Sequence, residues 1–137
     1  MGNKAHTLSR IHRLGIAVPS GVVIERQVFE HWLDATALRG EIDRLSGAID
    51  PMDVRALHEA SNAIQNLVLA APLPELTASV IDRIAANMLP HAPLVVRSSA
   101  VGEDGATASF AGQLDSILHV RTAAELQQAI LTCWASY

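Results

Sequence analysis

The segment from Leu94 to Val120 most constrains the fold of this 137-residue chain. The apolar run Leu94–Val96 leads directly into Arg97, so it predicts a short buried strand with a cation at its C-terminal end. Residues 98–113 are rich in glycine, alanine and serine and show little regular pattern; a loop of this length is usually functional or disordered. Ser116–Val120 then reads as a second strand. Because α/β folds place ligand contacts at the C-terminal ends of strands, this segment is the first place to look for a site.

Helical patterns surround these strands. Apolar residues recur at helical spacing over five stretches, which are residues 5–14, 28–33, 52–70, 75–89 and 123–136. The third stretch is opened by Asp50-Pro51, in which the aspartate can cap the helix, and the last by the capping box Thr122–Glu125. Residues 35–49 predict a helix broken near Gly40 and Gly47.

One more short apolar run, Val22–Ile24, predicts a third strand. We therefore expect a mixed α/β (α+β) domain in which helices outnumber strands. The three strands should share one small sheet, with helices 52–70, 75–89 and 123–136 packed on both of its faces, because the runs at 22–24 and 94–96 are apolar on both sides. The loop 98–113 is expected to be mobile without a ligand, since its small side chains bury little area.

Composition narrows the classes of function. Half of the residues are apolar and 18% are charged, which suits one folded domain, and with only 4% aromatic residues the core is expected to be aliphatic. The net charge of −4 argues against nucleic acid as a partner. The longest apolar run, Leu67–Ala71, is too short to span a membrane, and no signal peptide is visible, so we expect a cytoplasmic protein.

Residues that could carry chemistry are few. The six histidines lack a second ligand at helical spacing, so no metal site is predicted, and the single cysteine, Cys133, lies on an apolar helical face and reads as an inert core thiol. Arg97 has two readings. Its guanidinium can bind a phosphate through two hydrogen bonds, or it can form a structural ion pair with Glu103 or Asp104.

Two ordered motifs resemble the N-terminal nucleotide-binding domain of phosphoenolpyruvate synthase, pyruvate phosphate dikinase and rifampicin phosphotransferase. The first motif comprises Gly2-Asn3-Lys4-Ala5, Leu8 and the run Gly15-Ile16-Ala17-Val18-Pro19-Ser20-Gly21-Val22-Val23-Ile24. The second comprises Arg97-Ser98-Ser99-Ala100, Glu103-Asp104, Ala108-Ser109-Phe110-Ala111-Gly112-Gln113, Asp115-Ser116 and Cys133-Trp134-Ala135-Ser136. Residues 26–92 match only in their helical character.

The resemblance implies that residues 1–137 are the first part of an ATP-grasp fold. It further implies an ATP-dependent phosphotransferase that passes phosphate from ATP through a phosphohistidine to pyruvate or a similar small acceptor. The implied nucleotide contacts are Lys4, Arg97, Gly112 and Ser116, with Arg97 also in a catalytic role. The Mg²⁺ ligands, the second half of the fold and the other domains of the enzyme would lie beyond this chain, which alone would be inactive.

Two expectations follow for the ends of the chain. The helical pattern is still running at Tyr137, which predicts a truncated piece of a longer enzyme, although a natural helix that frays there is the other reading.

The alternative function is a remnant or partner-requiring module without nucleotide binding. If the resemblance holds, Lys4 and Arg97 must meet although 93 positions separate them, and an anion would relieve their mutual repulsion.

Overall fold

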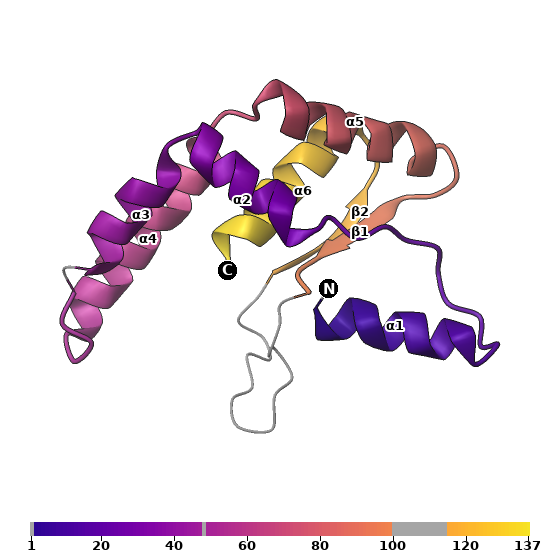
Figure 1. Cartoon of the computed structure of the whole chain (residues 1–137), viewed down its shortest axis with the longest axis horizontal. Helices are drawn as coiled ribbons and strands as arrows, with labels where there is room; N and C mark the ends of the chain where they lie inside the picture. The colour runs from indigo at the N-terminus through magenta and orange to yellow at the C-terminus, as the bar shows by residue number, and fades with distance from the viewer. Residues whose placement is uncertain (1, 48, 100–114) are drawn as a thin grey trace.

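The computed structural model of the chain describes residues 2–47, 49–99 and 115–137. Six helices and two strands follow one another along the chain (Figure 1). In order they are α1 (Asn3–Arg13), α2 (Arg26–Ala35), α3 (Leu38–Gly47), α4 (Val54–Ala70), α5 (Glu75–Met88), β1 (Leu94–Arg97), β2 (Ser116–Val120) and α6 (Ala123–Ala135). The domain is mixed α/β and rich in helix, as predicted.

The sheet has two antiparallel strands, β1 and β2, with the bounds that the sequence predicts. The predicted third strand at 22–24 is wrong: this run forms no strand and lies beside α5, where Val22 and Val23 are exposed and Ile24 packs against the core. Coverage of the sheet on both faces is also wrong for the described residues. Leu94, Val96 and Ile117 face the helices, whereas Val95 and Leu118 on the other face are 58% and 60% exposed.

Side-chain caps begin two of the helices, α4 and α6. The capping box of α6 is present, with Thr122 Oγ1 accepting the N–H of Glu125 at 3.1 Å. The start of α4 differs from prediction: Asp53, not Asp50, is the N-cap and accepts the N–H groups of Arg55 and Ala56. The break before α3 falls at Ala37, which has a φ of 55°, rather than at Gly40.

The core has two clusters that share α6. The first is aliphatic and joins α5, α6 and the sheet around Ile81, Ala85, Val120, Leu126, Ala129 and Ile130. The second joins α2, α3, α4 and α6 around Trp32, Leu33, Leu38, Val68 and Leu131. The predicted packing of α4 on the sheet is therefore wrong, because α4 packs on α3 and α6 instead.

The second cluster is aromatic, contrary to the expectation of a wholly aliphatic core. Trp32 is fully buried, and the ring centroids of Trp32 and Trp134 are 4.9 Å apart. Phe29 lies 5.9 Å from Trp32 and 5.3 Å from Trp134. Four of the five aromatic residues thus gather in one place, since Tyr137 also packs its edge on Phe29.

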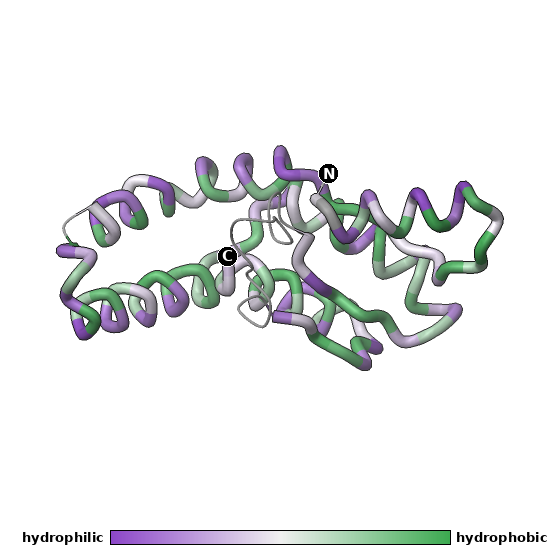
Figure 2. The backbone as a smooth tube through the Cα atoms, turned by 90° about the horizontal axis from the view of Figure 1, so that it is seen from below, coloured by the Kyte–Doolittle hydropathy of each residue, from purple (hydrophilic) through white to green (hydrophobic). Residues whose placement is uncertain are grey.

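The polar and apolar positions that produce this packing can be followed along each helix in Figure 2. Within the described residues, no single helix is both long and apolar enough to cross a membrane. Only α4 and α5 taken together, across a bend of 76°, reach that length and composition.

Candidate functional site

Four element ends meet at one end of the two-stranded sheet. They are the C-terminal end of β1, the start of β2, the start of α1 and the last turn of α6 (Figure 1). All of the predicted site residues that the structure describes lie at three of these ends. The fourth, α6, contributes contacts that sequence reasoning did not find.

Arg97 and Ser116 are opposite each other in the ladder of β1 and β2. Directly opposed residues of an antiparallel pair project their side chains to the same face. Both residues are exposed, so the guanidinium and the hydroxyl are available to a ligand on that face. The register therefore brings together two of the residues that the resemblance implies for the nucleotide.

The start of α1 is attached to the segment that follows β1. The N–H of Ala5 donates to Oγ of Ser99 at 3.1 Å, across 94 positions of sequence. Ala5 follows Lys4, and Ser99 lies two residues after Arg97. This hydrogen bond brings Lys4 to the end of the sheet at which Arg97 lies, as Figure 1 shows for the N-terminus of α1.

The last turn of α6 holds the backbone of Asp115, immediately before Ser116. The N–H of Asp115 donates to Oγ of Ser136 at 3.1 Å, and the thiol of Cys133 donates to the carbonyl oxygen of Asp115 at 3.5 Å. The Ser136 hydroxyl in turn donates to the Cys133 carbonyl at 2.9 Å. Both backbone groups of Asp115 are thereby engaged, which fixes where β2 begins.

The electrostatics of this sheet end favour an anion. Four arginines elsewhere pair with a carboxylate on a neighbouring turn or helix, in the pairs Arg26–Glu30, Arg39–Asp34, Arg44–Glu41 and Arg55–Glu59. Arg97 has no ion pair with any residue that the structure describes. Its predicted alternative partners, Glu103 and Asp104, lie outside the described residues, as do Gly112 and most of the segment 98–113 that is predicted to be mobile.

A buried hydroxyl adds to this donor set. The Ser98 Oγ is buried and, like Thr77 Oγ1 in the core, has no hydrogen-bond partner among the described residues. An unpaired buried hydroxyl costs about 1–3 kcal/mol, which a ligand oxygen would recover. A guanidinium, an ammonium group and two hydroxyls at one sheet end have the chemistry of a phosphate site.

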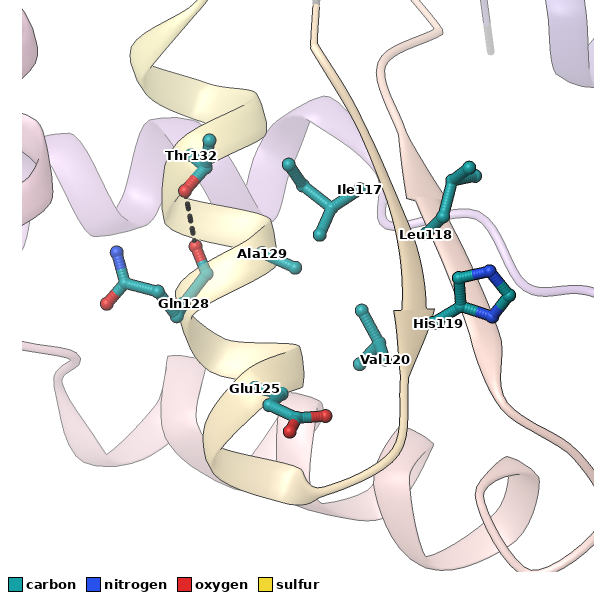
Figure 3. A pocket seen from close by; sticks show the side chains of 8 residues that line it. All are labelled: Ile117, Leu118, His119, Val120, Glu125, Gln128, Ala129 and Thr132. Atoms are coloured by element: carbon teal, nitrogen blue, oxygen red, sulfur yellow. Dashed lines mark hydrogen bonds between the residues drawn. The ribbon is translucent and has the colours of Figure 1, made fainter.

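Two surface grooves lie away from these residues. The first, of about 350 Å³, runs between β2 and α6 and is lined by four apolar and four polar residues (Figure 3). The second, of about 440 Å³, lies between residues 22–28 and α5. Lys4, Arg97 and Ser116 line neither groove, so we assign the candidate site by its charge and hydrogen-bond donors rather than by its concavity.

A β-bulge shapes the wall of the first groove. Leu94 pairs with Val120 and Val96 with Ile117, so β2 has one residue more than β1 between these pairs. His119 takes up the extra residue with a φ of 59°. In Figure 3, Ile117 and Val120 therefore both point toward α6, while Leu118 and His119 lie on the other side of the strand.

A divalent cation finds no ligand set in the described part of the chain. No group of three or more histidine, cysteine or carboxylate side chains there could hold a metal ion. The residues present thus fit the phosphates of a nucleotide but not Mg²⁺.

Sequence reasoning missed the contacts that assemble this sheet end. Ser99 and Ser136 both belong to the motifs that carry the family resemblance, but no spacing rule links Ser99 to Ala5 or Ser136 to Asp115. The only available signal was that these serines sit in motifs beside residues with an implied role.

The fold and this donor set define a helix-rich α/β domain with the features of a phosphate-binding unit. Comparison with protein families makes the class specific: residues 1–137 match the pyruvate phosphate dikinase AMP/ATP-binding domain. The chain belongs to this family.

Several curated relatives align with nearly the whole chain. A rifampicin phosphotransferase from a Streptomyces species is 35% identical over 99% of the chain. Probable phosphoenolpyruvate synthase from Methanocaldococcus jannaschii is 32% identical over 98%, and phosphoenolpyruvate synthase from Pseudomonas aeruginosa is 31% identical over 94%. The chain spans 16%, 12% and 17% of the lengths of these three relatives, respectively.

Proposed function

We propose that this chain is the N-terminal ATP-binding part of a dikinase-type phosphotransferase. The complete enzyme passes phosphate from ATP through a phosphohistidine to pyruvate or a similar small acceptor. In this proposal Lys4, Arg97, Gly112 and Ser116 contact the nucleotide, and Arg97 also stabilises the phosphoryl group in transfer. The chain alone is inactive, because it supplies one side of the nucleotide site.

The observation that supports the proposal most is the hydrogen bond between Ala5 and Ser99. This bond brings the first turn of α1, which carries Lys4, to the strand end that carries Arg97, and two cations at one place repel each other. A bound anion offsets that repulsion. The family match and the relatives named above make ATP the anion of choice.

The chemistry of phosphoryl transfer fits what these residues offer. The reaction requires positive charge and hydrogen-bond donors around the phosphates more than it requires covalent catalysis by the protein. The guanidinium of Arg97 binds two phosphate oxygens at once, and the ammonium group of Lys4 adds a second positive charge. The hydroxyl of Ser116, exposed on the same face as Arg97, donates a single hydrogen bond to the same oxygens.

The rest of the proposal concerns parts of the enzyme beyond these residues. An ATP-grasp fold is completed by a second half, which supplies the adenine contacts and the carboxylates for Mg²⁺. The metal neutralises phosphate charge when it is bound. The partners are then the nucleotide and the remaining domains of the same enzyme, and the protein acts in the cytoplasm without binding nucleic acid or membrane.

The test is the substitution Arg97→Ala in the full-length enzyme. Loss of a charge-assisted contact costs about 1.5–3 kcal/mol, so we expect the affinity for ATP or kcat/KM for ATP to fall about 10- to 150-fold. Calorimetry measures the affinity for ATP, and steady-state kinetics on the same preparation measures kcat/KM.

Arg121→Ala is the matched control. Arg121 is an exposed arginine that follows β2, at the opposite end of the same sheet from Ser116 and Arg97. It should leave the ATP parameters within about twofold, as expected for a surface change away from the site. Equal effects of the two substitutions, or none from Arg97→Ala, would overturn the assignment of the ATP site and favour a module that binds no nucleotide.

A further inference from the structure

The start of α1 lacks the cap that a helix of this kind normally carries. The N-cap residue is Gly2, and it makes no side-chain hydrogen bond to the first turn. Serine, threonine, aspartate or asparagine usually takes this position, because their side-chain oxygens accept the N–H of the second or third helical residue. Without such an oxygen, these donors are left to water, to a ligand or to another part of the chain.

Ser99 supplies the missing oxygen from a remote part of the sequence. Ala5 is the third residue of α1, and its N–H donates to Ser99 Oγ at 3.1 Å. The helix α6 provides an internal standard for this contact, since Thr122 Oγ1 accepts the N–H of its third residue, Glu125, also at 3.1 Å. In α6 the capping oxygen belongs to Thr122, the residue immediately before the helix. In α1 it belongs to a residue 94 positions away from Ala5.

This cap also determines where Lys4 lies. Ser99 lies two residues after Arg97, the last residue of β1, so the oxygen that caps α1 belongs to the same short segment as the guanidinium. Capping by Ser99 therefore holds the first turn of α1, with Lys4, at the end of the sheet. A local cap at position 2 would stabilise the helix equally well but would not bring it to the sheet.

We propose that Ser99 is a positioning residue for ATP binding, which acts by holding Lys4 near Arg97 and does not itself contact the nucleotide. The inference rests on the proposed function. It differs from a purely structural role because the effect of Ser99 on the nucleotide must pass through Lys4.

The contact itself is tested without any nucleotide. In the full-length enzyme, Ser99→Ala should increase the exchange rate of the Ala5 amide by about 2- to 30-fold, the range for loss of a capping side chain. Ser99→Thr keeps the hydroxyl and should restore the protection. Ser79→Ala is the matched control, because its exposed hydroxyl bonds only to the Leu76 carbonyl of its own helix and should leave the Ala5 amide unchanged.

The positioning role is tested by a double-mutant cycle on the dissociation constant for ATP. Ser99→Ala should weaken binding by about 2- to 30-fold, and by no more than Lys4→Ala does. In the Lys4→Ala background the further effect of Ser99→Ala should disappear, because no ammonium group is left to position. In the Arg97→Ala background its effect should persist.

The outcomes separate this inference from the proposed function. If neither Lys4→Ala nor Arg97→Ala alters ATP affinity, the proposed function fails, and the inference fails with it. If those substitutions weaken binding but Ser99→Ala does not, or if Ser99→Ala has its full effect without Lys4, only the positioning role is overturned. Unchanged exchange of the Ala5 amide in Ser99→Ala would overturn the cap directly.

Discussion

Cys133 shows how a single side chain can serve both the core and the candidate site. It is 6% exposed, and its thiol donates to the Asp115 carbonyl at the start of β2. Burial, with a smaller contribution from the nearby Asp115 carboxylate, raises the pKa of the Cys133 thiol to about 11. This agrees with the prediction of an inert core thiol, because a thiol is nucleophilic only when ionised.

The raised pKa predicts a pH dependence of stability. Below pH 9.0, the ordinary value, the thiol is protonated in both the folded and the unfolded chain, and its contribution to stability is fully present. Between pH 9.0 and about 11 only the unfolded state ionises, so that contribution is lost as the pH rises.

Urea unfolding at pH 7.5 and at pH 10.5, with Cys133→Ala as the reference, measures this effect. The free energy of unfolding of the wild type should exceed that of Cys133→Ala by less at the higher pH. The other titrating groups are common to both proteins and cancel in the difference. A difference that is constant with pH would contradict the raised pKa.

The bulge in β2 is the strained part of the sheet. His119 has a φ of 59°, in the left-handed region that β-branched residues rarely adopt, and its side chain is exposed. His119→Val should therefore lower the free energy of unfolding by about 1–2 kcal/mol through backbone strain alone.

Thermal or chemical denaturation of His119→Val beside Leu118→Val provides the measurement. Leu118 is the preceding residue, is 60% exposed and lies outside the left-handed region. Its substitution by valine should therefore lower the free energy of unfolding by less than about 0.5 kcal/mol. Similar losses in the two variants would show that the bulge carries no strain.

At the same scale, the elements differ in how well sequence predicts them. Both strands and the α6 capping box follow from local signals. The strand signal is a short run of apolar character, and the capping signal is a threonine three positions before a glutamate. Each signal involves only a few neighbouring residues. Val22–Ile24 has the same local signal but no strand beside it, and strand formation needs a partner that a single segment does not reveal. Asp50 and Asp53 compete for one helix start, and only the folded turn decides between them.

The candidate site is less predictable for a similar reason. The motifs identify Arg97 and Ser116 separately, but their pairing depends on the register of two strands that are not adjacent in the sequence. The contacts of Ser99 and Ser136 join distant segments through single hydrogen bonds, and such contacts leave no periodic pattern in a sequence.

The molecule as a whole is built on one shared helix. α6 contributes Leu126, Ala129 and Ile130 to the aliphatic cluster and Leu131 to the aromatic one, and Trp134 packs against both. A helix common to two clusters should make them unfold together, since neither cluster can lose α6 without exposing the other.

Ile81→Val tests this cooperativity. Ile81 is fully buried in the aliphatic cluster, so the substitution should cost about 0.5–1.5 kcal/mol. Trp32 reports on the aromatic cluster and Trp134 contacts both clusters, so the fluorescence transition should shift by the same amount as the circular dichroism transition. A shift in circular dichroism without one in fluorescence would mean that the two clusters unfold separately.

The remote cap of α1 has a consequence for how the chain is made. α1 is synthesised before the serine that caps it, which follows 94 positions after Ala5. At roughly 5–20 residues per second, translation needs about 5 to 20 seconds to cover that distance. A helix of 11 residues is marginal in water by itself, so α1 waits on the ribosome without its anchor. The residues of α1 are thus made well before the contact that holds them at the end of the sheet.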